Sequence, residues 1–368
     1  MKRFSMVQSC FRNSFWKSIC ATLAMLIFLA GIASAQGTQS GPVWDQPSVL
    51  TAQASSGPSP AVHEDWESIT LETSTFKLEP PLLGEIDDVP GKPFIRERWH
   101  LTWRPGDIED IYVVRPRGTT KPAVILYLYS FPQDTDRFKD DAWCTTTTSR
   151  GYAAVGFVSA LTGYRAEHRP AKEWFVSELQ ESLAGSVHDV QMILNYLATR
   201  GDFDMSRVGM FGQGSGGTIA ILASAADPRI AALDVLTPWG DWPDWLQASK
   251  LVPDGERTKY LTPEFLASVA ALDPVIWLPK AKARSIRIEN VRHDGVVPDA
   301  CQERVESAAP EFAEIDQYGD GRAFYPYAAG GRIFDWISAQ LQSGSKPQEV
   351  GDKSQLVHFF PAKAESIH

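Results

Sequence analysis

The strongest constraint on the fold is a regular alternation of apolar strand segments and helical segments over residues 94–341. Residues 123–129 form a continuous apolar run, which is typical of a strand buried on both faces of a sheet. Residues 178–200 instead repeat apolar side chains such as Leu183 and Val187 at helical spacing. Strands that alternate with helices need crossover connections, and these favour a mostly parallel, doubly wound sheet. The predicted class is therefore α/β.

The other predicted elements continue the alternation. Strands are predicted at 94–103, 108–114, 152–158, 207–211, 230–236, 285–291 and 312–318, and helices at 137–150, 218–226, 301–308 and 331–341. The first two strands are expected to form a hairpin around residues 104–106. Ligands of such sheets bind beyond the carboxyl ends of the strands. Functional residues are therefore expected in the loops that directly follow strands.

Residues 1–35 have the pattern of an export signal. Basic residues, among them Lys2 and Arg12, precede an apolar run at 19–29, and Ala33-Ser34-Ala35 provides small residues for cleavage. The run is shorter than the ~20 residues that span a bilayer. We expect cleavage near Ala35 and export to the periplasm or the extracellular space, with no membrane association afterwards. An uncleaved anchor is the alternative.

Composition divides the rest of the chain. Residues 36–90 are rich in Gln, Ser, Pro and Gly, which predicts a linker and a loosely ordered lead-in. Residues 91–342 carry the predicted α/β domain with a small Trp-rich insertion. Residues 343–368 are polar and without a pattern, and are expected to be a mobile tail.

The charge and the cysteines limit the possible partners. Loss of the four basic residues of the signal changes the formal net charge from −10 to about −14, which disfavours binding to nucleic acid. Only Cys144 and Cys301 remain after cleavage, and they form either a disulfide or two buried free thiols. Neither these cysteines nor the seven histidines have metal-ligand spacing, so no metal site is predicted.

A glycine-rich turn lies between the 207–211 strand and the 218–226 helix. It reads Gly212-Gln213-Gly214-Ser215-Gly216-Gly217. The turn and the strand before it resemble the nucleophile elbow, Gly-x-Ser-x-Gly, of the α/β-hydrolase superfamily, especially its dienelactone-hydrolase, esterase and prolyl-oligopeptidase-like branches. The resemblance covers residues 94–341. It implies the α/β-hydrolase fold and a Ser, Asp, His triad that cleaves esters or peptides.

The register of this motif departs from that of the superfamily. If Gly212 and Gly216 are the two glycines of the motif, the nucleophile position falls on Gly214, and Ser215 is one residue late. Glycine has no side chain with which to attack a carbonyl. In the alternative, a remodelled turn lets Ser215 act as the nucleophile. A further possibility is that the glycines only allow the helix to pack closely on the strand.

The resemblance places the other two triad positions in later loops. Asp294 falls at the acid position in Arg292-His293-Asp294-Gly-Val-Val-Pro, where it could equally cap the next helix. Arg322 falls at the histidine position, and an arginine remains protonated and cannot accept the proton of a serine. His293 with Ser215 is the remaining candidate pair. The sequence therefore predicts an impaired hydrolase.

The predicted oxyanion loop departs as well. It follows the 123–129 strand and reads Ser130-Phe131-Pro132-Gln133. Pro132 has no N–H to donate, which leaves the N–H of Phe131 or Gln133 as a donor.

A binding role is the leading prediction. The backbone N–H groups of Gly214, Ser215 and Gly216 at the helix N-terminus, with Arg322, would suit a small acidic or ester-like ligand held without turnover. In the alternative, Arg322 forms an ion pair with Asp294.

The Trp-rich insertion follows the 230–236 strand. Trp239, Trp242 and Trp245 repeat every third residue, and could line a ligand wall or form one packed helix face.

A dinucleotide site is the third functional alternative. Gly212, Gly214 and Gly217 satisfy G-x-G-x-x-G, and Asp234 follows at the distance expected for a ribose ligand. The motif is weak, because any strand-to-helix turn padded with glycines can produce it. We therefore predict no cofactor.

Overall fold

A computed structural model describes residues 62–131, 135–161, 165, 179–328, 331–342 and 356–361. All of these lie in one compact unit, Val62–His368. The predicted export signal, the linker before residue 62 and most of the C-terminal tail lie outside the described residues. Within the part of the chain that is described, no helix is long and apolar enough to cross a membrane.

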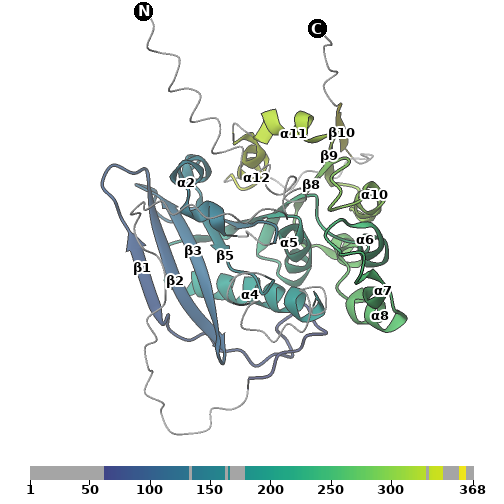
Figure 1. The fold of residues 1–368 in the computed structure, drawn as a ribbon. Coiled ribbons are helices and arrows are strands. Elements are labelled where there is room, and N and C mark those ends of the chain that lie inside the picture. Colours follow the sequence, from purple (N-terminus) through teal and green to yellow (C-terminus); the bar gives the residue numbers. More distant parts are fainter. Residues whose placement is uncertain are drawn as a thin grey trace, which may run out of the picture. The chain divides into compact units, whose positions relative to one another are not determined.

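One sheet organises the described unit. Its ten strands follow the order β1 (Leu83–Asp87), β2 (Phe94–Arg104), β3 (Asp107–Pro116), β5 (Ala153–Phe157), β4 (Ala123–Leu128), β6 (Asp204–Gln213), β7 (Ile230–Leu236), β8 (Ser285–Val291), β9 (Glu314–Tyr318) and β10 (Leu356–Phe360). The pairs from β1 to β5 are antiparallel, and those from β5 to β10 are parallel. The prediction of a mostly parallel α/β sheet is confirmed (Figure 1).

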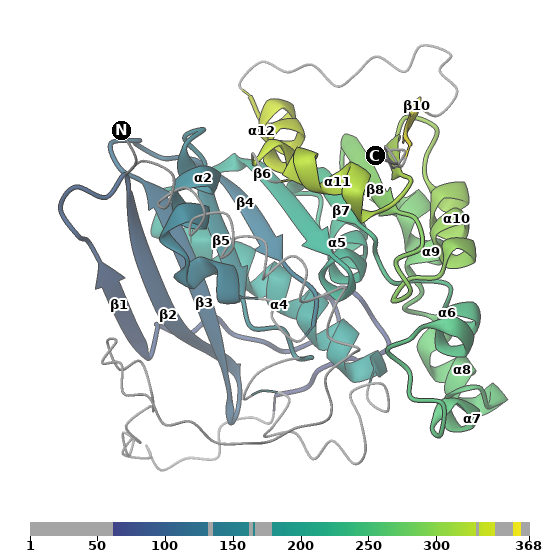
Figure 2. The same ribbon diagram turned by 45° about the horizontal axis from the view of Figure 1, so that its top comes forward.

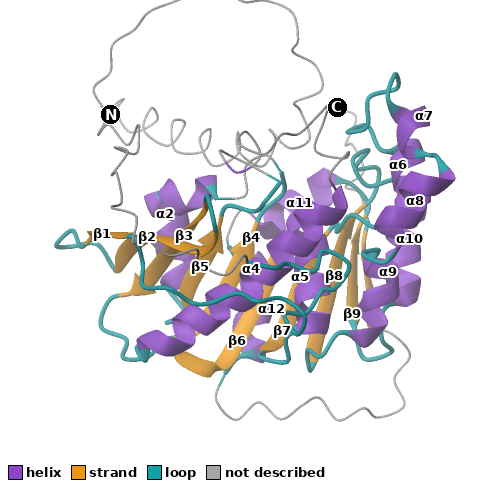
Figure 3. Cartoon of the chain, turned by 90° about the horizontal axis from the view of Figure 1, so that it is seen from below, coloured by secondary structure: helices purple, strands orange, loops and turns teal. Residues whose placement is uncertain are grey.

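Helices cover both faces of this sheet. Two separate clusters of buried side chains define the two layers. One cluster contains side chains of α4 (Leu179–Arg200), α5 (Ser215–Ala226) and α10 (Asp299–Ala308). The other contains side chains of α2 (Asp141–Thr148), α11 (Gly321–Ala328) and α12 (Asp335–Gln340). Figure 2 turns this second layer toward the viewer, and Figure 3 shows the strands between purple helices.

The segment between β7 and β8 forms a small helical insertion. Its helices are α6 (Trp242–Ala248), α7 (Arg257–Tyr260), α8 (Pro263–Ala270) and α9 (Pro274–Trp277). Figure 1 shows α6, α7 and α8 together beside the main domain. Asp273 begins α9, and its side chain accepts hydrogen bonds from the backbone N–H groups of Asp241, Trp242 and Val275. One carboxylate therefore connects the start of the insertion to its end.

Outside the insertion between β7 and β8, three of the described elements were not predicted from the sequence. β1 is a short edge strand with acidic residues and little burial, so it lacks the apolar signal of a core strand. α11 contains Pro326 and begins beside Asp320, whose side chain accepts hydrogen bonds from the N–H groups of Arg322 and Ala323. β10 lies in the tail that was expected to be mobile. Residues 62–78, within the segment expected to be loosely ordered, instead pack on the domain, with the side chain of Ile69 3% exposed.

Candidate functional site

The glycine-rich turn forms a sharp bend at the carboxyl end of β6. Gly214 joins β6 to α5 with φ 56° and ψ −120°, a backbone conformation that side chains strongly disfavour. The bend is fixed from both sides, because the N–H of Gly214 donates to Leu236 O (2.9 Å) and its carbonyl accepts from the N–H of Trp239 (3.3 Å). Gly214 therefore lies at the tip of a strained strand-to-helix turn, where a nucleophile elbow carries its serine.

The space beside Gly214 is already filled. A Cβ atom built on this glycine would lie 2.4 Å from Ser130 Oγ, 2.9 Å from Ser130 Cβ and 3.2 Å from Trp239 Nε1. Ser130 follows β4 and is 8% exposed. Its hydroxyl therefore occupies the region into which a side chain at position 214 would project.

The hydroxyl of Ser215 points toward the neighbouring loop. Ser215 is the first residue of α5, is 2% exposed, and its Oγ accepts a hydrogen bond from the N–H of Phe131 (2.9 Å). In serine hydrolases the loop that corresponds to the one after β4 supplies one N–H donor of the oxyanion hole. Here the N–H of Phe131, in that loop, donates to the hydroxyl of Ser215 instead. Pro132 and Gln133 lie outside the described residues.

The glycines around the tip have a structural role of their own. A Cβ atom on Gly216 would lie 2.1 Å from Leu128 O, and one on Gly212 would lie 2.4 Å from Gly216 O. Both glycines let α5 approach β4 and β6 closely. This is the packing role that the sequence left open.

Asp294, at the predicted acid position, caps a turn. Its Oδ1 atom accepts hydrogen bonds from the N–H groups of Val296 (2.8 Å) and Val297 (3.1 Å). Burial raises the pKa of its carboxyl group above the usual range. Asp294 therefore caps this turn and not the next helix, α10, whose N-cap residue is Pro298.

The predicted partner of Ser215, His293, points elsewhere. Its backbone has φ 63°, and its side chain is 79% exposed and forms an ion pair with Asp299 (2.9 Å). Among the described residues, no imidazole forms a hydrogen bond with Ser215 or Ser130. The structure therefore does not bring the proposed Ser215–His293 pair together.

Arg322 lies on the first turn of α11 and faces outward. Its side chain is 62% exposed, and its guanidinium lies 3.7 Å from the carboxylate of Asp320. This pairing with Asp320 differs from both arrangements considered in the sequence, an inward-facing guanidinium and an ion pair with Asp294.

The three tryptophans of the insertion are buried. Trp239, Trp242 and Trp245 are 0%, 1% and 0% exposed. The rings of Trp239 and Trp245 stack at 4.8 Å, and Trp242 meets Trp245 edge-on at 5.9 Å. The three rings pack in the core, but they do not form one helix face, because α6 begins at Trp242 and Trp239 precedes it. Trp239 and Trp242, assigned to ligand binding from the sequence, lie in the core, and only Trp239 reaches the elbow.

The two cysteines do not form a disulfide. Cys144 and Cys301 are buried free thiols, and burial raises the pKa of Cys144 to about 11 and that of Cys301 to about 12.

Asp234, the ribose ligand of the dinucleotide alternative, is 0% exposed and accepts two hydrogen bonds from Arg287 (2.9 and 2.7 Å). The structure contradicts the dinucleotide interpretation, because this carboxylate cannot reach a ribose.

A buried charged cluster surrounds Arg287, on β8, and was not predicted from the sequence. Its guanidinium contacts Asp234, Glu289 (3.0 Å) and Asp316 (3.6 Å). The hydroxyl of Tyr318 donates to Glu289 (3.1 Å). The available signal was an arginine and a glutamate inside the apolar 285–291 strand, because buried charges occur in proteins only when they are paired.

The cluster gives a prediction for stability against pH. Burial raises the pKa of Glu289 to about 8, so the folded protein keeps a proton that the unfolded chain releases from about pH 4.5. The free energy of unfolding should therefore fall as pH rises from 4.5 through 8, by at most about 1.4 kcal/mol per pH unit for this proton. Glu289→Gln keeps a neutral side chain and should flatten the decline. Urea unfolding of the wild-type protein and of Glu289→Gln at pH 5 and pH 8 gives the change in free energy of unfolding between the two pH values. An equal change in both proteins would refute the raised pKa of Glu289.

The described residues contain no group of three or more His, Cys, Asp or Glu side chains arranged to hold a metal ion.

Solved structures of hydrolases share this architecture. An acetyl xylan esterase from Paenibacillus sp. R4 is 16% identical and superposes with a TM-score of 0.54, over 70% of this chain and 89% of the esterase. A 2,6-dihydroxy-pseudo-oxynicotine hydrolase is 22% identical, with a TM-score of 0.51 over 68% and 69% of the two chains. The Pyrococcus horikoshii acylaminoacyl peptidase is 14% identical, with a TM-score of 0.54 over 70% of this chain and 43% of its own. No protein-family model matches the sequence, and no curated protein matches it.

Proposed function

We propose that this chain, whose fold is that of the α/β hydrolases, is an exported protein that no longer cleaves acyl substrates at its elbow and acts by binding. The observation that carries the proposal is the tip of the elbow. Gly214 holds the turn conformation of a nucleophile, but it has no hydroxyl, and Ser130 fills the space beside it.

The nearest alternative nucleophile is poorly placed. The hydroxyl of Ser215 accepts a hydrogen bond from the N–H of Phe131, and no imidazole among the described residues is in hydrogen-bond contact with it. General-base activation requires such a contact, and loss of the base typically costs about four orders of magnitude in rate. The N–H of Phe131, one of the expected oxyanion donors, already donates to Ser215.

The ligand that we propose is a small acidic or ester-like molecule. Because Ser130 occupies the space beside Gly214, we place the ligand farther out along the carboxyl edge of the sheet. The exposed guanidinium of Arg322 supports an anionic group on such a ligand. The formal net charge of −10 gives no attraction to nucleic acid.

A second candidate function is ester or peptide hydrolysis through Ser215. The structural neighbours favour it, because their names describe an esterase, a hydrolase and a peptidase. For this function the hydroxyl of Ser215 would have to give up its hydrogen bond with the N–H of Phe131 and form one with a general base elsewhere in the chain.

Covalent labelling distinguishes the two functions. The purified chain is treated with a fluorophosphonate probe and assayed with p-nitrophenyl esters of several chain lengths. We expect no labelling and no hydrolysis above that of the matched variants Ser215→Ala and Ser130→Ala, because neither hydroxyl has an activating base. Ser268→Ala, at an exposed serine of α8, serves as the control.

Labelling that disappears only in Ser215→Ala would establish hydrolysis through that serine and overturn the proposal. Labelling that disappears only in Ser130→Ala would also overturn it, and would place the nucleophile in the loop after β4.

A further inference from the structure

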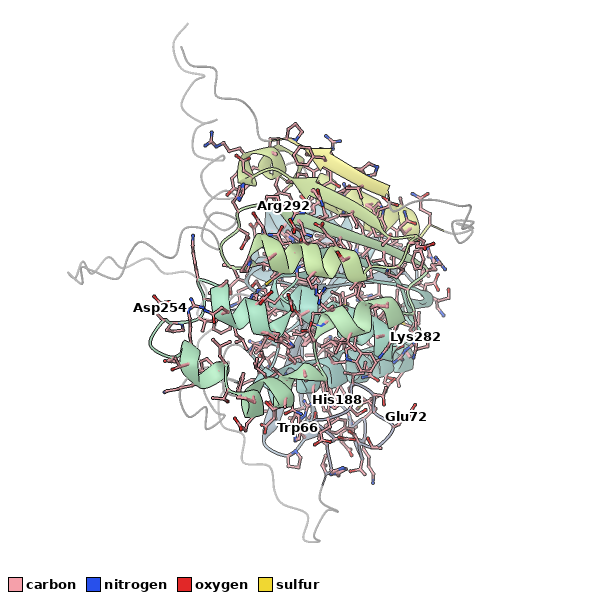
Figure 4. The ribbon with its side chains drawn as sticks, turned by 90° about the vertical axis from the view of Figure 1, so that its right-hand side faces the viewer. Trp66, Glu72, His188, Asp254, Lys282 and Arg292 are labelled. Atoms are coloured by element: carbon pink, nitrogen blue, oxygen red, sulfur yellow. The ribbon has the colours of Figure 1, made fainter. Side chains whose placement is uncertain are left out.

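Strand β10 ends the sheet on one side. It pairs in parallel with β9, and among the described residues no strand pairs with its other side. In Figure 4 it is the yellow strand at the outer end of the sheet. Three of its side chains are apolar and exposed: Val357 is 50% exposed, Phe359 62% and Phe360 40%. The strand therefore combines an unpaired side of its backbone with exposed apolar side chains.

The pairing with β9 shows which backbone groups of β10 point away from the sheet. Phe360 O accepts a hydrogen bond from the N–H of Gly319 (2.8 Å), so the backbone groups of Phe360 point toward β9. The N–H and C=O of one residue lie on the same side of a strand, and the side alternates from residue to residue. The groups of His358 therefore also point toward β9, and those of Val357 and Phe359 point outward. Each of these two residues offers one donor and one acceptor.

A second copy of the same strand can pair with all of these outward groups. In an antiparallel pair, opposite residues exchange two hydrogen bonds at one position and none at the next. If His358 lies opposite His358 of a second copy, Val357 of each copy lies opposite Phe359 of the other. Both of these residue pairs then exchange their two hydrogen bonds, and no outward group is left over. Each pair also joins an aromatic to a β-branched side chain, a combination that stabilises sheets.

The strand at the opposite end of the sheet is not self-complementary in this way. β1 also exposes an apolar side chain, Ile86, but it carries Glu85 and Asp87 on either side of it. Antiparallel self-pairing about Glu85 would place two carboxylates opposite each other, and self-pairing about Ile86 would place Glu85 opposite Asp87. Like charges at opposite positions destabilise a sheet, and charged residues are a common protection of edge strands. β10, with the sequence Leu-Val-His-Phe-Phe, contains no Asp, Glu, Lys or Arg.

We propose that two copies of this chain form a two-fold dimer in which their β10 strands pair antiparallel about His358, so that two ten-stranded sheets join into one. A two-fold axis closes the assembly at two copies, whereas pairing of β10 with β1 of another copy would continue into a filament. Each His358 keeps the contact of its Nδ1 with Asp316 Oδ1 (2.8 Å) of its own chain, so a carboxylate accompanies each ring. The inference does not depend on the proposed function, because it involves no residue of the elbow.

Sedimentation velocity of the purified chain tests the dimer. At loading concentrations of about 1–100 µM we expect a reversible monomer–dimer equilibrium, because a contact centred on one short strand belongs to the small, transient class of interfaces. Phe359→Lys should raise the dissociation constant about tenfold or more, since the two-fold axis removes the aromatic partner from both pairs and an edge lysine opposes pairing. Ile86→Lys, at a similarly exposed apolar residue of β1, is the matched control and should keep the wild-type dissociation constant.

A cysteine at the centre of the pairing tests its register. Opposite residues that exchange no hydrogen bonds lie about 4.5 Å apart at Cα, within the range that a disulfide spans. At a concentration where the wild-type chain is dimeric, mild oxidation should therefore link His358→Cys into a covalent dimer about tenfold or more faster than Ile86→Cys, because pairing raises the effective concentration of the two thiols. The wild-type chain, which has four cysteines of its own, gives the background of the reaction.

A wild-type chain that stays monomeric up to about 100 µM overturns the proposal, and this result needs no variant. A dimer that is unchanged in Phe359→Lys, or that is weakened equally in Ile86→Lys, overturns it as well. Species that grow beyond a dimer with concentration would indicate pairing between different edges and would refute the two-fold assembly. If His358→Cys links no faster than Ile86→Cys, the strands do not pair about residue 358.

Discussion

Gly214→Ala is expected to lower the free energy of unfolding by about 2–6 kcal/mol. About 1–3 kcal/mol comes from placing a side chain at φ 56° and ψ −120°. A similar amount, about 1–3 kcal/mol, comes from overpacking, because the new Cβ would lie 2.4 Å from Ser130 Oγ. Urea unfolding gives the difference from the wild-type protein, provided that the slope with denaturant is unchanged.

A control glycine separates the two contributions to this cost. Gly151 also has a positive φ of 80°, but a Cβ atom there would meet nothing within 4 Å. Gly151→Ala should therefore show backbone strain alone. The double variant Ser130→Gly, Gly214→Ala should recover the steric part of the loss. If Gly214→Ala cost no more than Gly151→Ala, Ser130 would not occupy the space beside the elbow.

The same geometry bears on restoring a triad. Gly214→Ser with Arg322→His would place a serine and a histidine at the positions implied by the superfamily resemblance. The new serine would meet Ser130, and Arg322 starts from an exposed position beside Asp320. Restoration would therefore also require a smaller residue at 130.

The second large effect is expected at Asp189, which lies in the middle of α4 and is 0% exposed. Its carboxylate forms hydrogen bonds with Arg104, with Trp103 Nε1 (2.9 Å) and with Arg165 (2.9 Å). Asp189→Asn leaves two buried guanidinium groups without their shared charge partner. We expect a loss of about 3–5 kcal/mol, as is typical when one member of a buried ion pair is removed.

A surface pair provides the matched control for Asp189. Asp335 pairs with Arg150 but its side chain is 54% exposed, so Asp335→Asn should cost at most about 1 kcal/mol. The two arginines also hold the pKa of Asp189 below its usual range, despite burial, which acts in the opposite direction. Its stabilisation is present above the unfolded-state pKa and is lost as pH falls below it. If both variants cost the same at pH 7, the buried network would not stabilise the fold.

Much of the sheet could be predicted from the sequence because its segments alternate regularly between strand-like and helix-like patterns, and β4 is a continuous apolar run. β4 and β8 lie where the 123–129 and 285–291 segments placed them, and the 94–103 and 108–114 strands form the expected hairpin. β1 and β10 were missed because each is a five-residue edge strand whose pairing depends on distant partners.

The candidate site was only partly predictable. The spacing of the motif placed Gly214 at the tip of the bend, because the position of the tip depends only on the local sequence. Two contacts of the site could not be predicted in this way: Ser130 beside Gly214, and Phe131 with Ser215. Both join the end of β4 to the end of β6, which are far apart in the chain. The every-third-residue spacing of Trp239, Trp242 and Trp245 could not decide between a wall and a core, since both need the same spacing.

The buried ionic network could not be predicted for a related reason. Arg104 is the last residue of β2, Asp189 lies in α4, and Arg165 lies between β5 and α4 in the sequence. The local sequence of each segment gives no indication that these charges are buried together. Only the packing of these segments against one another makes the three charges mutual partners.

The position of β10 has a practical consequence for anyone who shortens this protein. Its backbone pairs along the whole of β9, and the ring of Phe360 covers that of Tyr318 at 4.8 Å. A chain that stopped at residue 342 would leave an unprotected row of backbone donors and acceptors and an uncovered aromatic ring at the sheet margin. Such margins recruit strands from other molecules. Precipitation of a truncated preparation would then reflect the missing margin rather than a failure of the hydrolase-like core.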